Sequence, residues 1–382
     1  MAAGRSRGAV AGRAERSVAV GAVTGGRTVL LTGGLGGAHL APALARALGP
    51  QRLTVVVNVG DDLDWHGLRV CPDLDTVLYA LGGRLDRERG WGLTGETFTV
   101  GAALQAMGQP AWFGVGDRDL ATHLVRTELL GAGRTLSGAT AELAGRLGLG
   151  DPAVVPAADV ACPTRIRLAD GRWTGFQEWY VGMGAAAPVR AVQVGRGPAA
   201  PAALAAVAQA STVVLGPSNP VTSIGTILAL DGMAEAVARA RQVVAVSPTV
   251  GGVPPTGSVA HHTRARRHLL AASGDEDTAA GVARHYARHH PGLVHIFVLD
   301  AGDAGEWQAV ADLGLDPVMA PVLDPAGLAR AVADVVTAGM VAPVGMVVPT
   351  GMVAPTQLGR VEDRPARSMP RRLLAQAAGR DE

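Results

Sequence analysis

The stretch Thr28-Val-Leu-Leu-Thr-Gly-Gly-Leu-Gly-Gly37 joins a short apolar run to a glycine-rich turn. Leucines at positions 40, 44 and 48 then recur at helical spacing, and a second apolar run, Leu53-Thr-Val-Val-Val57, follows. A strand, a glycine-rich turn, a helix and a second strand in about thirty residues predict one βαβ unit of a parallel sheet. Glycines at this junction let the backbone approach a phosphate at the helix N-terminus, but they can also serve tight packing alone.

Aspartates gather directly after the second apolar run. Between Asn58 and Thr76 the chain carries Asp61, Asp62, Asp64, Asp73 and Asp75. Carboxylates beyond the end of a buried strand are costly for folding unless they are paired, solvated or bound to metal. In an open parallel sheet, ligands bind beyond the carboxyl ends of the strands. The stretch is therefore predicted to form the floor of an active site.

The same alternation continues along the chain. Apolar runs recur at 212–215, 242–246 and 294–299, helical stretches lie between them, and small polar residues or aspartates follow each run. This pattern predicts an α/β fold with a doubly wound, mostly parallel, Rossmann-like sheet. The segment at about 77–150 is expected to be a mainly helical insertion. Residues 164–181 are expected to form a hairpin with its turn at Asp170-Gly171.

The chain is expected to hold one Rossmann-like domain at 28–337, preceded by a flexible extension at 1–27. A low-complexity tail is expected at 338–382, where a Gly-Met-Val motif recurs at Gly339, Gly345 and Gly351 and is followed by proline. Proline at that spacing forbids a regular helix.

Composition narrows the function classes. The chain has 382 residues, 48% of them hydrophobic, and a net charge of +1. That is enough for a large core, and it gives no argument for nucleic acid or an anionic membrane as a partner. Two cysteines make no disulfide framework and favour the cytoplasm. The chain has no lysine, so phosphate contacts fall to arginine, histidine, backbone N–H groups or metal.

The segment Gly116-Asp-Arg-Asp-Leu-Ala-Thr-His123 is predicted to open a helix that runs to about Leu130. Asp119, His123 and Arg126 lie at positions i, i+4 and i+7 and share one face of that helix. Two interpretations stay open. The face is either solvated, with charges paired along the helix, or a cationic helix start suited to a phosphate-rich ligand.

Taken together, these segments resemble the 2-phospho-L-lactate transferase family of deazaflavin biosynthesis, which includes bacterial phosphoenolpyruvyl transferases. The resemblance spans roughly 28–335. It rests on the segments 33–37, 58–62, 72–76, 90–92, 116–123, 176–178, 216–220 and 247–252. It implies transfer of a phosphoenolpyruvyl or 2-phospholactyl group from a guanosine diphosphate-linked donor to the ribityl hydroxyl of the deazaflavin Fo. GMP is released, and the product belongs to coenzyme F-420 biosynthesis.

The resemblance also implies roles for particular residues. The expected catalytic residues are Asp61, Asp62 and Asp75. The expected ligands of the cofactor, Mg²⁺, are Asp61, Asp62 and Asp73. Residues assigned to the deazaflavin are Asp75, Trp91, Arg118 and His123. Residues assigned to the donor and its phosphates are Gly33, Gly34, Gly36, Gly37, His39, Gly216, Ser218, Asn219 and Ser247. A cytoplasmic homodimer acting on small molecules is expected, without nucleic acid or membrane.

The chain departs from the family pattern at three places. His39 stands where lysine is common, Glu96 stands where aspartate is common, and residues 255–258 lack the usual Lys-Gly-Pro. Two alternative functions account for parts of this pattern. An NAD(P)-dependent oxidoreductase would use the first βαβ unit, but Asn58 stands where an acidic residue is expected to bind the ribose. A non-catalytic deazaflavin-binding protein would explain the departures at positions 39 and 96.

Overall fold

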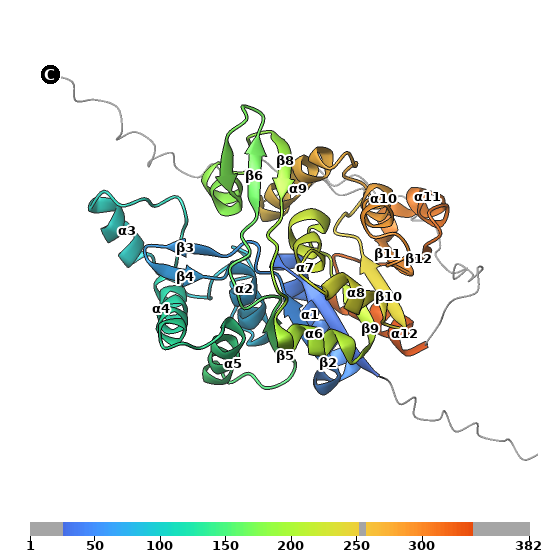
Figure 1. Cartoon of the computed structure of the whole chain (residues 1–382), viewed down its shortest axis with the longest axis horizontal. Helices are drawn as coiled ribbons and strands as arrows, with labels where there is room; N and C mark the ends of the chain where they lie inside the picture. Colours follow the sequence, from blue (N-terminus) through green and yellow to red (C-terminus); the bar gives the residue numbers. More distant parts are fainter. Residues whose placement is uncertain (1–25, 252–256, 339–382) are drawn as a thin grey trace, which may run out of the picture. The chain divides into compact units, whose positions relative to one another are not determined.

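A computed structural model describes residues 26–251 and 257–338 (Figure 1). Its central sheet has seven strands in the order β12-β11-β10-β9-β1-β2-β5, and every neighbouring pair is parallel. The strands are β1 (Arg27–Thr32), β2 (Leu53–Val57), β5 (Ala153–Pro156), β9 (Ala210–Leu215), β10 (Gln242–Val246), β11 (Ile296–Asp300) and β12 (Asp316–Ala320). The predicted parallel, Rossmann-like sheet is thereby confirmed. The predicted tail and nearly all of the N-terminal extension lie outside the described residues.

The winding of the sheet reverses between β1 and β9. From β1 the chain builds outward through β2 to β5, and it then returns to the other side of β1 as β9, followed by β10, β11 and β12. Leu30 and Leu31 of β1 are fully buried there, as are Val213 and Val214 of β9. Such a reversal opens a crevice at the carboxyl ends of the two strands, where ligands of this class of sheet bind.

Helices flank the sheet. Helix α1 (Gly34–Leu48) packs against α2 (Pro72–Leu81) and α12 (Pro325–Ala338), whereas α8 (Met233–Ala238) contacts α6 (Pro201–Ala208) and α7 (Gly225–Leu228). Helices α10 (Ala279–His289) and α11 (Trp307–Ala311) lie toward the β12 edge, whereas α9 (Gly257–Ala272) lies beside β8 (Val189–Gln193) (Figure 1). In the described part of the chain, no helix has the length and apolar character needed to cross a membrane.

The segment at 77–150 holds α3 (Thr99–Ala106), α4 (Asp117–Gly131) and α5 (Leu136–Arg146). Helix α4 contacts a small hairpin formed by β3 (Leu63–Trp65) and β4 (Leu68–Val70), which lies inside the aspartate-rich stretch. The sequence did not predict this hairpin. Its turn places His66 and Gly67 at φ angles of 50° and 80°, and such a turn is usually signalled by Asn-Gly rather than His-Gly.

A second small sheet has the order β7-β6-β8, with β6 (Arg165–Leu168), β7 (Trp173–Gly175) and β8 (Val189–Gln193). The predicted hairpin turn at Asp170-Gly171 is confirmed, but the prediction of a strand as far as Val181 is wrong. Strand β7 ends at Gly175, and a π-helical segment covers Glu178–Gly182. Phe176, Gln177 and Trp179 are all buried, and alternating strand positions could not bury this set on one side.

Candidate active site

A cleft of about 1200 Å³ opens at the carboxyl ends of the central strands. Loops after five strands line it, and they contribute Gly33 and Gly34 after β1, Asp61 and Asp73 after β2, Ser218 and Asn219 after β9, Pro248 and Thr249 after β10, and Asp303 after β11. The cleft therefore lies at the place where a doubly wound sheet binds its ligands.

The glycine-rich loop after β1 and the loop after β9 are hydrogen-bonded and closely packed. The Ser218 hydroxyl accepts a hydrogen bond from the Gly33 N–H at 3.1 Å and donates one to the Gly33 carbonyl at 2.7 Å. A Cβ atom on Gly36 would lie 2.2 Å from the Pro217 carbonyl oxygen, and one on Gly37 would lie 1.4 Å from Thr32 Oγ1. Gly36 and Gly37 are thus required for packing, while Gly33, Gly34 and Gly36 also line the cleft.

Helix α1 begins at Gly34, and its N-cap residue Gly33 has no side chain with which to cap it. The Gly34 N–H donates to the carboxylate of Asp73, which lies across the start of the helix. The first-turn N–H groups and the positive end of the helix dipole form an anion site in this wall of the cleft.

Asn58 holds two carboxylates side by side. Its amide nitrogen donates to Asp61 at 3.0 Å and to Asp73 at 2.9 Å. Burial, with the negative charge of Asp73, raises the pKa of Asp61 well above its usual range, and burial raises the pKa of Asp73 to about 6. Ionisation of these two enclosed carboxyl groups is costly, and a hard divalent cation bound to their oxygens would offset that cost.

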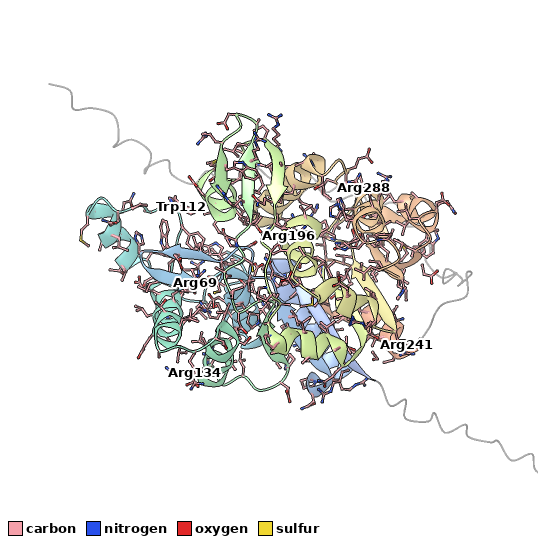
Figure 2. The ribbon with its side chains drawn as sticks, in the orientation of Figure 1. Arg69, Trp112, Arg134, Arg196, Arg241 and Arg288 are labelled. Atoms are coloured by element: carbon pink, nitrogen blue, oxygen red, sulfur yellow. The ribbon has the colours of Figure 1, made fainter. Side chains whose placement is uncertain are left out.

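Asp62 lies apart from this pair. It lines a second cavity, of about 400 Å³, which Asp61 also borders, together with Arg69 of β4 and Trp112 (Figure 2). Its Oδ1 atom is enclosed and finds no hydrogen-bond partner among the described residues, and burial raises the pKa of Asp62 to about 8. The predicted trio of metal ligands is therefore divided, because Asp61 and Asp73 line the cleft and Asp62 does not.

Asp75 is locked in a buried ion pair. Both terminal nitrogens of Arg126 donate to its carboxylate, one of them at 3.0 Å, and the Arg126 side chain is fully buried. His123 bridges two carboxylates, with Nδ1 3.5 Å from Asp75 and Nε2 3.4 Å from Asp119. The Tyr79 hydroxyl donates to Asp119 at 2.6 Å. The interpretation of this α4 face as solvated is wrong, because Asp119, His123 and Arg126 are all buried.

The other predicted residues separate into two groups. Trp91, His39, Ser218 and Asn219 line the cleft, as do His123 and Asp75. Within the described part of the chain, the lining of the cleft leaves out Arg118, Gly37, Gly216 and Ser247. Arg118 is exposed and donates to the Thr94 carbonyl at 2.9 Å. Ser247 is fully buried and bonds to the Thr249 hydroxyl at 2.6 Å.

Sequence reasoning missed one wall of the cleft. The Tyr180 hydroxyl lies 2.5 Å from Nδ1 of His262 on α9, and the Tyr180 ring stacks on Phe176 with centroids 5.2 Å apart. Burial, with the neighbouring His261, lowers the pKa of His262 to about 4, so this imidazole stays neutral at physiological pH. The aromatic run at 176–180 was visible in the sequence, but its pairing with α9 depends on tertiary contacts.

Comparison with known proteins identifies the family. A family model described as 2-phospho-L-lactate transferase CofD matches residues 28–301. The chain belongs to this family. It is therefore a transferase, and the alternative of an NAD(P)-dependent oxidoreductase is excluded.

Curated relatives cover most of this CofD family member. A protein named phosphoenolpyruvate transferase from Streptomyces griseus is 44% identical over 297 residues, which is 76% of this chain and 90% of the relative. Proteins of the same name from Thermobifida fusca and Mycobacterium avium are 43% and 40% identical, and the matches cover 73% and 77% of this chain and 87% and 86% of the relatives. A crystal structure of an upf0052 family protein from Bacillus halodurans matches with a TM-score of 0.53 at 15% identity, over 82% of this chain and 98% of that one. This last likeness bears on the fold alone.

The buried ion pair gives a test of the site's architecture. Arg126→Met should lower the free energy of unfolding by about 3–5 kcal/mol, because it leaves the Asp75 carboxylate buried without its partner. Arg146→Met is the matched control, since the Arg146–Glu142 pair is 53% and 42% exposed. The control should change stability by about 0.5 kcal/mol or less. Urea unfolding of both variants measures the difference, and equal effects would contradict the assigned role.

Proposed function

We propose that this CofD family member transfers a phosphoenolpyruvyl group from a guanosine diphosphate-linked donor to the terminal ribityl hydroxyl of the deazaflavin Fo, in coenzyme F-420 biosynthesis. The phosphoenolpyruvate transferase relatives support this three-carbon group over 2-phospholactyl. We place the reaction in the cytoplasm, because Cys71 and Cys162 are buried free thiols.

In the proposed reaction, the ribityl hydroxyl oxygen attacks the donor phosphorus that carries the three-carbon acid. A new phosphorus–oxygen bond forms, the bond to the bridging oxygen of the diphosphate breaks, and GMP leaves with that oxygen. The hydroxyl proton passes to a base on the protein. Such a transfer requires negative charge to be neutralised on both the attacked and the leaving phosphate.

The observation that carries the proposal is the meeting of Asp61 and Asp73 with the N-terminus of α1 in one cleft. The N–H groups of α1 would bind phosphate oxygens of the donor. Asp61 and Asp73 would hold Mg²⁺, which prefers carboxylate oxygens and, when bound, neutralises phosphate charge. Asp62 opens into the other cavity and is left out of this ligand set.

Asp61 is the carboxylate we assign to accept the hydroxyl proton, because it lines the cleft and the Asn58 amide holds it beside Asp73. Asp75 keeps a positioning role, since Arg126 engages both of its oxygens and it holds His123 at the edge of the cleft. For the flat deazaflavin ring, we propose the aromatic wall that contains Trp91, Phe176 and Tyr180.

Product analysis tests the function. The protein, Fo and Mg²⁺ are incubated with each of the two synthetic donors, and the products are identified by mass spectrometry. The phosphoenolpyruvyl adduct should form with one GMP released per adduct. Asp61→Asn should lower kcat by about 100-fold or more, as expected for loss of a general base. Asp64→Asn is the matched control, because Asp64 lies on the same segment but its side chain is 72% exposed and pairs only with Arg69.

The control variant should keep near-normal turnover. Tight binding of Fo without GMP release from either donor would contradict the transfer reaction and favour a binding protein. Equal losses in Asp61→Asn and Asp64→Asn would contradict the assignment of Asp61.

Metal binding should depend on pH in a defined direction. Asp73 has a folded-state pKa of about 6, above its unfolded value of about 3.9. Its contribution to stability is thus complete below about pH 4 and is lost as the pH rises through about 6. Because Mg²⁺ binds the ionised carboxylates, it should raise Tm more at about pH 7.5 than at about pH 5. Thermal unfolding with and without Mg²⁺ measures this, and Asp73→Asn should remove the difference while Asp64→Asn keeps it.

We also propose a homodimer that forms through α3. All residues of this helix are at least partly exposed, although Val100, Ala102, Ala103, Leu104 and Ala106 are apolar. Phe98 and Met107 beside it are 39% and 69% exposed. A contiguous exposed apolar surface of this kind marks an interaction site, and a second copy of the chain is the partner we assign to it.

Light scattering tests the dimer. The unmodified protein should have twice the mass of one chain, and Leu104→Asp should give the mass of one chain, because it places a charge at the centre of the apolar surface. Val160→Asp is the control, since Val160 is 46% exposed on the loop after β5. A dimer that survives Leu104→Asp would show that another surface forms it.

A further inference from the structure

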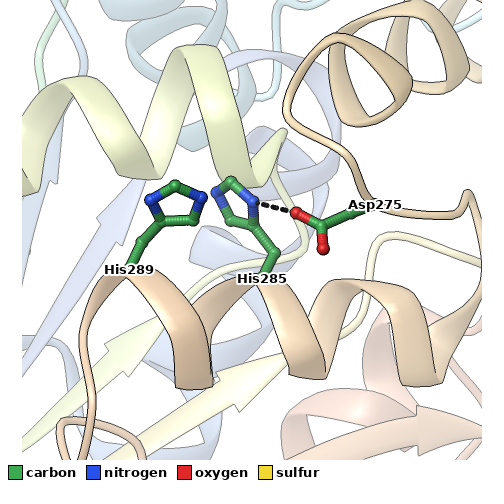
Figure 3. Close-up of side chains that lie close together, drawn as sticks. All are labelled: Asp275, His285 and His289. Atoms are coloured by element: carbon green, nitrogen blue, oxygen red, sulfur yellow. Dashed lines mark hydrogen bonds and ion pairs between the residues drawn. The ribbon is translucent and has the colours of Figure 1, made fainter.

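A second group of metal-ligating side chains lies outside the cleft. His285 and His289 stand four residues apart on α10, and Asp275 lies on the turn that precedes this helix (Figure 3). The two imidazole centroids are 4.4 Å apart. One possible ligand atom from each of the three side chains lies within 4.8 Å of the others. Spacing of i, i+4 on a helix is a recurrent way to present two histidines to one cation.

The hydrogen bonds set the tautomer of His285. Its Nδ1 lies 2.8 Å from Asp275 Oδ2, and because a carboxylate can only accept, Nδ1 carries the proton. The Nε2 lone pair is therefore available, and Figure 3 shows the His285 ring between Asp275 and His289. A carboxylate that orients a histidine in this way is typical of metal sites.

The burial of the three residues suits a site at the surface. The Asp275 side chain is fully enclosed, His285 is 5% exposed and His289 is exposed. The inner residues are thus fixed, while the outer one leaves room for entry and for water ligands. Arg288 donates to the same Asp275 oxygen at 2.7 Å and balances its charge, so the two imidazoles are the main ligands. The same guanidinium nitrogen lies 3.4 Å from His289 Nε2, and a cation bound at that atom would have to displace it. The other oxygen, Oδ1, is buried and finds no partner among the residues described.

We propose that His285 and His289, oriented by Asp275, form a binding site for a borderline-soft divalent cation such as Zn²⁺. Imidazole nitrogen suits Zn²⁺, Ni²⁺ and Cu²⁺, whereas Mg²⁺ requires oxygen ligands. The site is thus chemically distinct from the carboxylate pair in the cleft.

A bound cation would tie α10 to the turn before it. That turn also carries Asp277, which accepts from Arg266 Nε at 2.5 Å, and Arg266 in turn donates to the Pro248 carbonyl at 2.8 Å in the lining of the cleft. The expected consequence is greater stability of this edge of the fold with Zn²⁺, because a ligand that binds only the native state raises Tm.

Calorimetric titration with Zn²⁺ in excess Mg²⁺ at about pH 7.5 tests the proposal. The unmodified protein should bind one more Zn²⁺ than His289→Ala, and Asp275→Asn should weaken that site by about 10- to 100-fold. His66→Ala is the matched control, because His66 is also exposed but lies on the β3–β4 turn. His289→Ala should melt normally without Zn²⁺, since its side chain is exposed, but should lose the Zn²⁺-dependent rise in Tm.

Equal Zn²⁺ stoichiometry and affinity in the unmodified protein and in His289→Ala would overturn the proposal. The cluster would then be a structural arrangement in which Asp275 holds His285 and Arg288. The same conclusion would follow if the unmodified protein bound no Zn²⁺ at all.

Discussion

The hydrogen bonds from the Asn58 amide to Asp61 and Asp73 are the constraint on which the site depends. They hold two largely buried carboxyl groups together where burial disfavours their ionised forms, and such a pair is unfavourable unless its oxygens find hydrogen-bond partners. The sheet fixes Asn58 itself, because its N–H extends the β1–β2 ladder to the Thr32 carbonyl at 2.8 Å. The neighbouring loops must fit around this pair. A Cβ atom on Gly33 would lie 2.5 Å from Asp73 Oδ2, so the glycine there is a consequence of the carboxylate beside it.

The five aspartates between Asn58 and Thr76 lie in three kinds of environment, and each environment determines the chemistry of its carboxyl group. Arg126 forms a buried ion pair with Asp75, which serves the architecture of the site. Burial raises the pKa values of Asp61, Asp62 and Asp73, which makes them able to exchange protons or to bind a cation near neutral pH. Asp64 is exposed and serves a surface ion pair with Arg69. Neighbouring aspartates thus differ in role: Asp75 holds the architecture of the site through its ion pair, whereas Asp61 and Asp73 have raised pKa values.

The sequence predicted the features that depend on local residue pattern and strand order. It did not predict which cavity each side chain faces or which side chains are buried by tertiary contacts. The apolar runs fixed β1, β2, β9, β10 and β11, so the loops that meet at the reversal between β1 and β9 could be named in advance. Asp61 and Asp62 are adjacent and both line the smaller cavity, but only Asp61 also reaches the large cleft, and the backbone path into the unpredicted β3–β4 hairpin decides this difference. Likewise, the spacing of Asp119, His123 and Arg126 gave the shared face correctly. Only the tertiary structure shows that this face contacts Asp75 and Tyr79 rather than solvent.

The departures from the family pattern also acquire physical meaning. Glu96 accepts from the N–H groups of both Arg118 and Asp119, each at 2.8 Å, so it caps α4 and stabilises the helix that carries His123. His39 lines the cleft, but burial and the nearby Arg87 lower its pKa, so it provides no fixed positive charge near neutral pH. In the reaction proposed above, the charge of a diphosphate would then be met by the N-terminus of α1, by a cation on Asp61 and Asp73, and by arginines of α9. Arg266 and Arg267 line the same cleft, and the Arg267 side chain is 70% exposed, with its Nε 3.9 Å from Asp277 Oδ2.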